Sequence, residues 1–195
     1  MPKLGMEPVR RRALIGAAVE AIHEHGFCEV TMGQIAARAG VSAGLAHHYF
    51  GSKEQLLTAT MRHLLSELGA EIVSRLSRAE GPRQRVSAVI AGNFAPGQFR
   101  PAVISAWLAF YVQAESLADA RRLHGIYARR LRSNLVHDLA RLVSRERAFA
   151  VADGAAALVD GIWLRQVLRV GEPDAATAIA MVEDYVALQL ERGRM

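Results

Sequence analysis

Apolar residues recur every three or four positions along most of this chain, and that spacing marks one face of an α-helix. Glycine and proline interrupt the pattern near residues 81, 96, 101 and 171, where helices are expected to end. No stretch shows the period-two alternation of Val, Ile and Thr that is typical of a half-buried strand. The pattern therefore predicts an all-α fold of about nine helices, covering about 8–25, 32–39, 43–50, 53–79, 83–95, 102–114, 118–143, 145–170 and 173–191.

The segment TMGQIAARAGVSAGLAHHYFGSKEQL, residues 31–56, contains three helix-start signals. Thr31 with Gln34, and Ser52 with Gln55, have the form of a capping box, in which the hydroxyl accepts an amide hydrogen bond and the glutamine reaches back to the cap. Ser42 stands where an N-cap serine follows a tight turn. These signals predict two short helices followed by a longer helix that begins at residue 53.

The two short helices have the pattern of a helix-turn-helix. The small residues Ala36 and Gly40 allow the helices to cross closely at the turn. The outer face of the second helix carries short or weakly polar side chains, so this helix could enter the major groove of DNA. The residues of that face are Ser42, Ala43, Gly44, His47 and His48. The alternative interpretation is a helical hairpin whose polar face is only solvated.

The whole pattern of this segment, T-x-x-x-I-A-x-x-A-G-V-S-x-G followed by Y-F and K-x-x-L, resembles the N-terminal domain of the TetR family of transcriptional repressors. It is carried here by Thr31, Ile35, Ala36, Ala39, Gly40, Val41, Ser42, Gly44, Tyr49, Phe50, Lys53 and Leu56. The resemblance implies a helix-turn-helix DNA-binding domain over residues 1–52 and a ligand-binding and dimerisation domain over residues 53–195.

The resemblance also implies which residues contact operator DNA. They are Thr31, Gln34, Ser42, Ala43, Gly44, His47, His48, Tyr49 and Lys53. His47 is a departure, because many family members have a tyrosine there that contacts the operator backbone, so this one contact stays open. Lys53 is expected to contact a phosphate, since free amides and the helix dipole at the start of its helix also favour an anion.

A further similarity extends over nearly the whole chain, to the choline-responsive members of that family. It is carried by MPKLGM followed by RRR, GNF at 92–94, AWLAF at 106–110, RLRSNLV at 130–136 and ALVDGIWLR at 157–165. It implies a repressor of the genes for choline uptake and for the conversion of choline to glycine betaine. The alternatives are a TetR-like repressor of another small cationic or apolar effector, and a helical interaction protein that does not bind DNA.

Aromatic residues in the larger domain suit such an effector. Trp107, Phe110 and Tyr111 have the spacing i, i+3, i+4 and share one helix face, and Trp163 follows Asp160 by three positions. A quaternary ammonium has no hydrogen-bond donor and is held by aromatic ring faces, so these residues with an acidic group predict a binding site for choline or a similar cation.

Other assignments of these aromatic residues stay open. Glu115 is an alternative to Asp160 as the acidic group, and Phe94, Phe99 and Tyr127 lie on other segments that could converge on the same site. An aromatic stripe is also typical of an ordinary core. Trp163 has a further alternative role in a dimer interface, because the last two helices usually form that interface in this family.

The net charge of the chain adds little to the prediction of DNA binding. The 195 residues carry a net charge of +5, which suits a polyanionic partner such as DNA but is weak evidence for one. A more local signal is the run Arg10-Arg11-Arg12 at the start of the first helix. Cations there oppose the helix dipole, so a phosphate partner explains them better than helix stability does.

The remaining sequence features indicate the cellular compartment of the protein and whether it carries catalytic or metal-binding motifs. The single cysteine, Cys28, excludes an intrachain disulfide and agrees with a reducing cytoplasm. The N-terminus lacks the apolar core of a signal peptide, and the longest uncharged runs are too short to span a membrane. There is no glycine-rich phosphate loop, zinc-type Cys/His spacing or nucleophile elbow. We therefore expect no enzyme activity, no cofactor and no metal.

A homodimer is expected, because two-fold pairing supplies a second recognition helix about one DNA turn away from the first. The predicted interface is the apolar side of the last two helices, around Leu158, Ile162, Trp163, Ile179, Val182 and Val186, although some of these residues are expected to be core.

Overall fold

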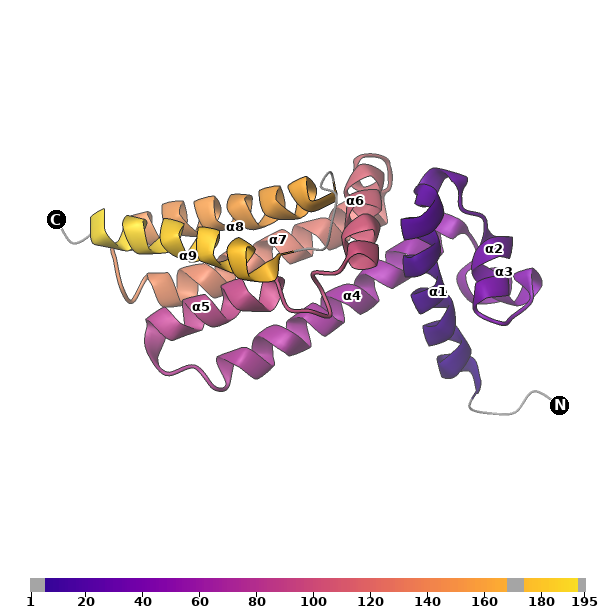
Figure 1. Cartoon of the computed structure of the whole chain (residues 1–195), viewed down its shortest axis with the longest axis horizontal. Coiled ribbons are helices and arrows are strands. Elements are labelled where there is room, and N and C mark those ends of the chain that lie inside the picture. The colour runs from indigo at the N-terminus through magenta and orange to yellow at the C-terminus, as the bar shows by residue number, and fades with distance from the viewer. Residues whose placement is uncertain (1–5, 168–173, 193–195) are drawn as a thin grey trace. The chain divides into compact units, whose positions relative to one another are not determined.

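The computed structural model describes residues 6–167 and 174–192. Within these ranges the chain forms nine α-helices and no strand (Figure 1), which confirms the all-α prediction. The helices are α1 Met6–Glu29, α2 Met32–Arg38, α3 Ala43–Phe50, α4 Lys53–Leu76, α5 Gly81–Asn93, α6 Pro101–Ser116, α7 Ala118–Leu139, α8 Arg145–Val167 and α9 Ala175–Arg192. The predicted helical positions 168–170 and 173 lie outside the described residues. None of the described helices is both long and apolar enough to cross a membrane.

The chain divides into two compact units, and neither is continuous in sequence. The first comprises Met1–Leu64 and Pro101–Arg122, and the second comprises Leu65–Arg100 and Leu123–Met195. Helix α4 contributes to both units, and α6 belongs to the first. These compact units therefore divide the chain differently from the predicted functional boundary between residues 52 and 53, which stays a prediction.

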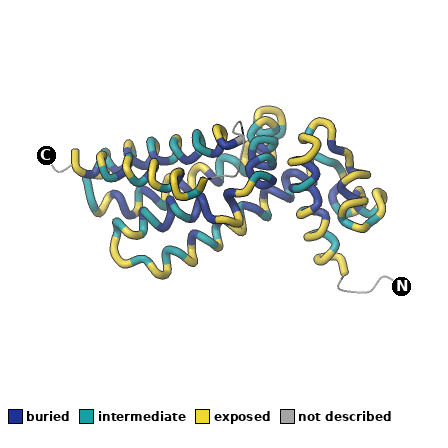
Figure 2. Tube along the Cα trace, in the orientation of Figure 1, coloured by how far each residue is buried: buried dark blue, intermediate teal, exposed yellow. Residues whose placement is uncertain are grey.

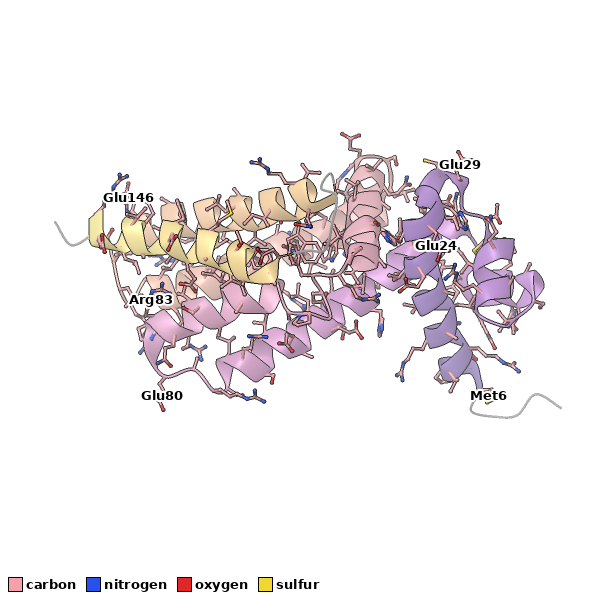
Figure 3. The ribbon with its side chains drawn as sticks, viewed as in Figure 1. Met6, Glu24, Glu29, Glu80, Arg83 and Glu146 are labelled. Atoms are coloured by element: carbon pink, nitrogen blue, oxygen red, sulfur yellow. The ribbon has the colours of Figure 1, made fainter. Side chains whose placement is uncertain are left out.

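The core of the first unit forms where α1 packs against α6 and α2, and α2 packs against α3. Its buried positions follow the inward sides of these helices (Figure 2) and include Leu14, Ile35 and Ala46. Gly26 has a positive φ of 74°, so α1 is interrupted there, as its sequence predicted, before one further turn. On the surface, Arg38 of α2 pairs with Glu24 of α1, which is labelled in Figure 3.

The second unit is held together by close helix packing and by one buried ion pair. A Cβ atom on Gly154 of α8 would lie 1.9 Å from the hydroxyl oxygen of Tyr185 in α9, so the Tyr185 side chain occupies the space that a side chain at residue 154 would need. Asp138 of α7 is almost fully buried, and both of its carboxylate oxygens accept from Nε of Arg85 at 3.0 and 3.1 Å. Because Arg85 also donates to the carbonyl oxygen of Leu76 at 3.4 Å, the pair links α5 and α7 to the end of α4.

Candidate nucleic-acid interface and effector cluster

The short helices begin where their capping residues predicted. The amide of Gln34 donates to Oγ1 of Thr31 at 3.2 Å, and the amide of Thr31 donates to Oε1 of Gln34 at 2.8 Å. Ser52 and Gln55 repeat this reciprocal pair at the start of α4, at 3.2 and 3.1 Å. Both capping boxes are confirmed, and they fix where α2 and α4 begin.

Helix α3 presents the outer face that its sequence predicted. The amide of Leu45 donates to Oγ of Ser42 at 3.2 Å, which makes Ser42 the N-cap. Ala46 and Phe50 are buried, so they form the inner side of the helix. The opposite side is exposed and consists of Ser42, Ala43, Gly44, His47 and His48. The helix-turn-helix therefore offers a face of small and weakly polar groups to a partner.

His47 makes a backbone contact that a tyrosine at this position would not make. Its Nδ1 atom lies 2.8 Å from the carbonyl oxygen of Gly51, the residue that caps the end of α3. A carbonyl oxygen only accepts, so Nδ1 carries the proton and Nε2 is the ring nitrogen left for a partner. The prediction that His47 contacts DNA stays open, and this geometry determines which atom would make the contact.

Lys53 contributes to the fold as well as being a candidate phosphate contact. Its ammonium donates to the carbonyl oxygens of Phe27 at 2.8 Å and Cys28 at 3.0 Å, and it lies 4.8 Å from the centre of the Phe27 ring. These contacts tie the end of α1 to the beginning of α4. An ammonium has three donors, so one remains for a phosphate.

Glu54 sets the charge at this helix start. Hydrogen bonding by the Ser52 hydroxyl lowers the pKa of Glu54 most, and hydrogen bonding to its own backbone amide lowers it further. Burial raises this pKa by a smaller amount, and the positive charge of Lys53 has the smallest effect and lowers it. Glu54 is therefore ionised at neutral pH. Its negative charge beside Lys53 makes this helix start a weaker anion site than the dipole alone predicts.

The predicted effector residues of the first unit form an aromatic group on α6. The ring of Trp107 lies 6.1 Å from that of Phe110 and 5.8 Å from that of Tyr111, measured between centroids. Trp107 and Phe110 are buried, and Tyr111 is half-buried. The three rings share one helix face, as their spacing predicted.

The predicted effector residues of the second unit are Asp160 and Trp163 of α8. Each contacts an aromatic residue from another segment. The hydroxyl of Tyr127 donates to Oδ1 of Asp160 at 3.2 Å. The ring of Phe99 contacts those of Trp163 and Phe94 at centroid distances of 5.5 and 5.1 Å, in edge-to-face orientation. Tyr127 therefore contacts α8 at Asp160, Phe99 contacts the same helix at Trp163, and Phe94 packs on Phe99. We call these five residues the Asp160 cluster.

Burial distinguishes between the alternative roles considered for Trp163, in the core or in a dimer interface, and between Glu115 and Asp160 as the acidic group. Trp163 is only 7% exposed within its own chain, which leaves little of its surface for a dimer partner. Glu115 is exposed, and its backbone carbonyl accepts from Arg121. Asp160, which is half-buried and held by Tyr127, is the better placed acidic group.

The residues predicted for the dimer interface differ in how far they are buried within the chain. Val182 and Val186 are fully buried inside the chain, so with Trp163 they belong to its core, whereas Leu158, Ile162 and Ile179 are half-buried. The exposed large apolar residues of α8 and α9 are Leu164, Met181 and Leu188, which are 50%, 50% and 55% exposed. The sequence pattern did not single them out, because an apolar residue on a helix gives no sign by itself of facing solvent or core.

Metal-ligating side chains do not gather anywhere in the described part of the chain: no group of three or more His, Cys, Asp or Glu is arranged to hold an ion. Cys28 is a free, exposed thiol.

Comparison with known proteins matches both halves of the chain to regulators. Residues 14–60 match the model of bacterial regulatory proteins of the tetR family, and residues 82–191 match the C-terminal domain of BetI-type transcriptional repressors. The HTH-type transcriptional regulator BetI of Brucella anthropi is 56% identical over 190 residues, covering 97% of this chain and 98% of the relative. BetI of Agrobacterium fabrum is 52% identical over 191 residues, covering 98% and 93%.

Solved structures give the same fold. A transcriptional regulator from Pseudomonas aeruginosa PAO1 has a TM-score of 0.80 at 27% identity, covering 97% of this chain and 96% of that one. A regulator from Saccharomonospora viridis in complex with choline has a TM-score of 0.78 at 19% identity, covering 93% and 97%. The Brucella and Agrobacterium relatives and both matching family models are transcriptional regulators, which confirms the prediction that the chain is not an enzyme. The chain belongs to the TetR family of DNA-binding transcriptional regulators, and its C-terminal domain is of the BetI repressor type.

Proposed function

We propose that this protein represses the genes for choline uptake and for the conversion of choline to glycine betaine, and that choline or a close quaternary ammonium compound is its effector. The observation that carries the proposal is the match of residues 82–191 to the BetI-type C-terminal domain, because this part of the chain is expected to bind the effector. TetR-family regulators bind operator DNA and small effectors and are typically dimers, which agrees with each part of the proposal.

DNA binding is expected through the exposed side of α3 and the start of α4. The exposed side chains of α3 are short, so the helix backbone can come close to base edges in the major groove. Thr31 and Gln34 lie at the start of α2 and Lys53 at the start of α4, where free backbone amides favour phosphate contacts.

Effector binding is expected at the Asp160 cluster of the second unit, and the α6 aromatic residues Trp107, Phe110 and Tyr111 of the first unit stay candidate effector residues by themselves. Choline carries a permanent charge but no N–H group, so a site must stabilise it with ring faces and a nearby carboxylate. Asp160 supplies the carboxylate, and Tyr127 restrains it through the 3.2 Å hydrogen bond. A protein of the same fold is known in complex with choline, so the fold is compatible with such a ligand.

Dimerisation is expected through α8 and α9. Leu164, Met181 and Leu188 are exposed on these two helices, although leucine and methionine are usually buried. A partner subunit would remove them from water, and the pair of recognition helices would then read two half-sites.

Calorimetric titration with choline tests the effector assignment. Asp160→Asn keeps the shape of the side chain and removes its charge, whereas Trp163→Leu keeps an apolar but smaller side chain and removes the ring face. Each is expected to weaken choline binding about 2–30-fold. Phe149→Leu is the matched control, because Phe149 also lies on α8 but stacks on Arg132 and Arg145 outside the cluster. Unchanged choline binding in both cluster variants would exclude the Asp160 cluster. Failure of the wild type to bind choline would leave a TetR-family regulator with a different effector.

A further inference from the structure

The C-terminal end of the recognition helix α3 is held by groups from outside the helix. Helix α3 has only eight residues, and a helix of this length is not stable by itself in water. Its last carbonyl groups lack intrahelical donors and must find them elsewhere. The amide of Gly51 donates to the carbonyl of His47 at 2.7 Å, and the amide of Ser52 donates to that of Phe50 at 2.9 Å. The carbonyl of Tyr49 accepts from a side chain on another helix.

That side chain is Arg11 of α1, 38 residues earlier in the sequence. Its Nη1 atom donates to the carbonyl oxygen of Tyr49 at 2.9 Å. The guanidinium carbon also lies 5.1 Å from the centre of the Tyr49 ring and 5.3 Å from that of Phe50. On its other side, Nε donates to Oε1 of Glu7 at 2.7 Å, which holds the guanidinium in place from its own helix.

We propose that Arg11 is a positioning residue, which orients the recognition helix for operator DNA and does not itself contact a phosphate. Its positive charge lies at the C-terminal end of α3, where a cation stabilises the helix dipole. Its fork of donors is divided between Glu7 and Tyr49, and its flat face covers two rings, so it restrains both the helix end and the Tyr49 side chain. These contacts give Arg11 a different role from the phosphate contact that the run Arg10–Arg12 predicted.

The inference uses the expected DNA contacts of α3 but does not depend on choline. A residue that positions the helix affects the fit to the operator, so its loss should weaken specific binding much more than non-specific binding. A residue that contacts a phosphate affects both, and its loss lowers the salt dependence of binding by about one unit.

Substitution by lysine separates the two roles, because lysine keeps the charge and can still contact a phosphate, but it lacks the fork and the flat face. Arg11→Lys is expected to weaken binding to the operator beside the protein's own gene about tenfold. Its affinity for unrelated DNA and its salt dependence should match those of the wild type. Arg12→Lys is the matched control, because it is the same charge-preserving substitution at the exposed neighbouring residue.

Hydrogen exchange of the free protein gives a second measurement that needs no DNA. In Arg11→Lys and Arg11→Gln, the amides of residues 43–51 should exchange faster, while those of α1 should be unchanged. The proposal is overturned if Arg11→Lys binds the operator like the wild type while Arg11→Gln lowers the salt dependence by about one unit, or if exchange in α3 is unaffected. If the wild type binds no DNA, the DNA contacts expected of α3 fail, and the exchange measurement still decides whether Arg11 restrains α3.

Discussion

The Nδ1 atom of His47 donates a hydrogen bond to the carbonyl oxygen of Gly51 across 2.8 Å. This contact fixes the tautomer of the neutral ring, so Nε2 is a hydrogen-bond acceptor there. A neutral His47 therefore cannot donate to a phosphate oxygen, whereas the hydroxyl of a tyrosine can. The consequence is that His47 is suited to accept from an amino group on a base edge, such as those of adenine and cytosine.

His47→Tyr is expected to replace this acceptor with a donor. Operator affinity should rise about threefold to tenfold through a new phosphate contact, and discrimination at one base pair of each half-site should fall. Binding titrations against operators with single base changes measure both effects. Nitrogen chemical shifts of the His47 ring test the tautomer directly, with exposed His137 as a reference. Protonation of Nε2 in the neutral His47 ring would contradict the interpretation.

Lys53→Ala should show two separable defects. Loss of the bonds to Phe27 and Cys28 should lower the free energy of unfolding by about 1–3 kcal/mol, measured in urea. Loss of the remaining donor should weaken binding to all DNA sequences alike and lower the salt dependence by about one unit for each lysine. A changed base preference would show that Lys53 reads sequence.

Contacts between residues that are close along the chain could be predicted from the sequence. Thr31 and Gln34 are three residues apart, so the capping pattern contains the whole hydrogen-bonded unit. The helix face shared by Trp107 and Tyr111 follows from helical geometry in the same way.

Long-range contacts could not be predicted in that way. Arg11 and Tyr49 are 38 residues apart, and Arg85 and Asp138 are 53 residues apart. Charge alone made Arg11 a phosphate candidate, because nothing in a single sequence indicates that the end of another helix lies beside it. The burial of Trp163 likewise depends on Phe99, which is contributed by a distant segment.

Close packing between α8 and α9 makes residue 154 sensitive to size. Gly154→Ala should lower the free energy of unfolding by about 1–3 kcal/mol, because the added methyl group overlaps the Tyr185 hydroxyl. Gly16→Ala is the matched control, since that exposed helical position has open space and should gain about 0.5–1 kcal/mol. Thermal unfolding of both variants measures the difference. A gain of stability in Gly154→Ala would mean that Tyr185 can move aside at little cost.

The exposed apolar residues of α8 and α9 predict how the protein dimerises. Leu188→Glu places a charge on the proposed interface and should shift the protein toward monomer at micromolar concentration in sedimentation velocity. Val73→Glu makes the same kind of change at a position on α4 that is 66% exposed, and should leave the dimer intact. A monomeric wild type would contradict the dimer, and an equal effect of both changes would contradict its location.

Choline is proposed to control the affinity of this TetR-family regulator for operator DNA, and one titration measures that control. Labelled DNA from beside the protein's own gene is titrated with the protein in the presence of millimolar choline, and separately with its neutral isostere, in which a tert-butyl group replaces the trimethylammonium. A ligand changes operator affinity only if it binds the DNA-bound and free conformations with different affinities. We expect choline to shift the operator dissociation constant by about 5–150-fold, and the neutral isostere to leave it unchanged. Equal operator affinity with and without choline, or an equal shift by the isostere, would contradict control of DNA binding by a quaternary ammonium effector.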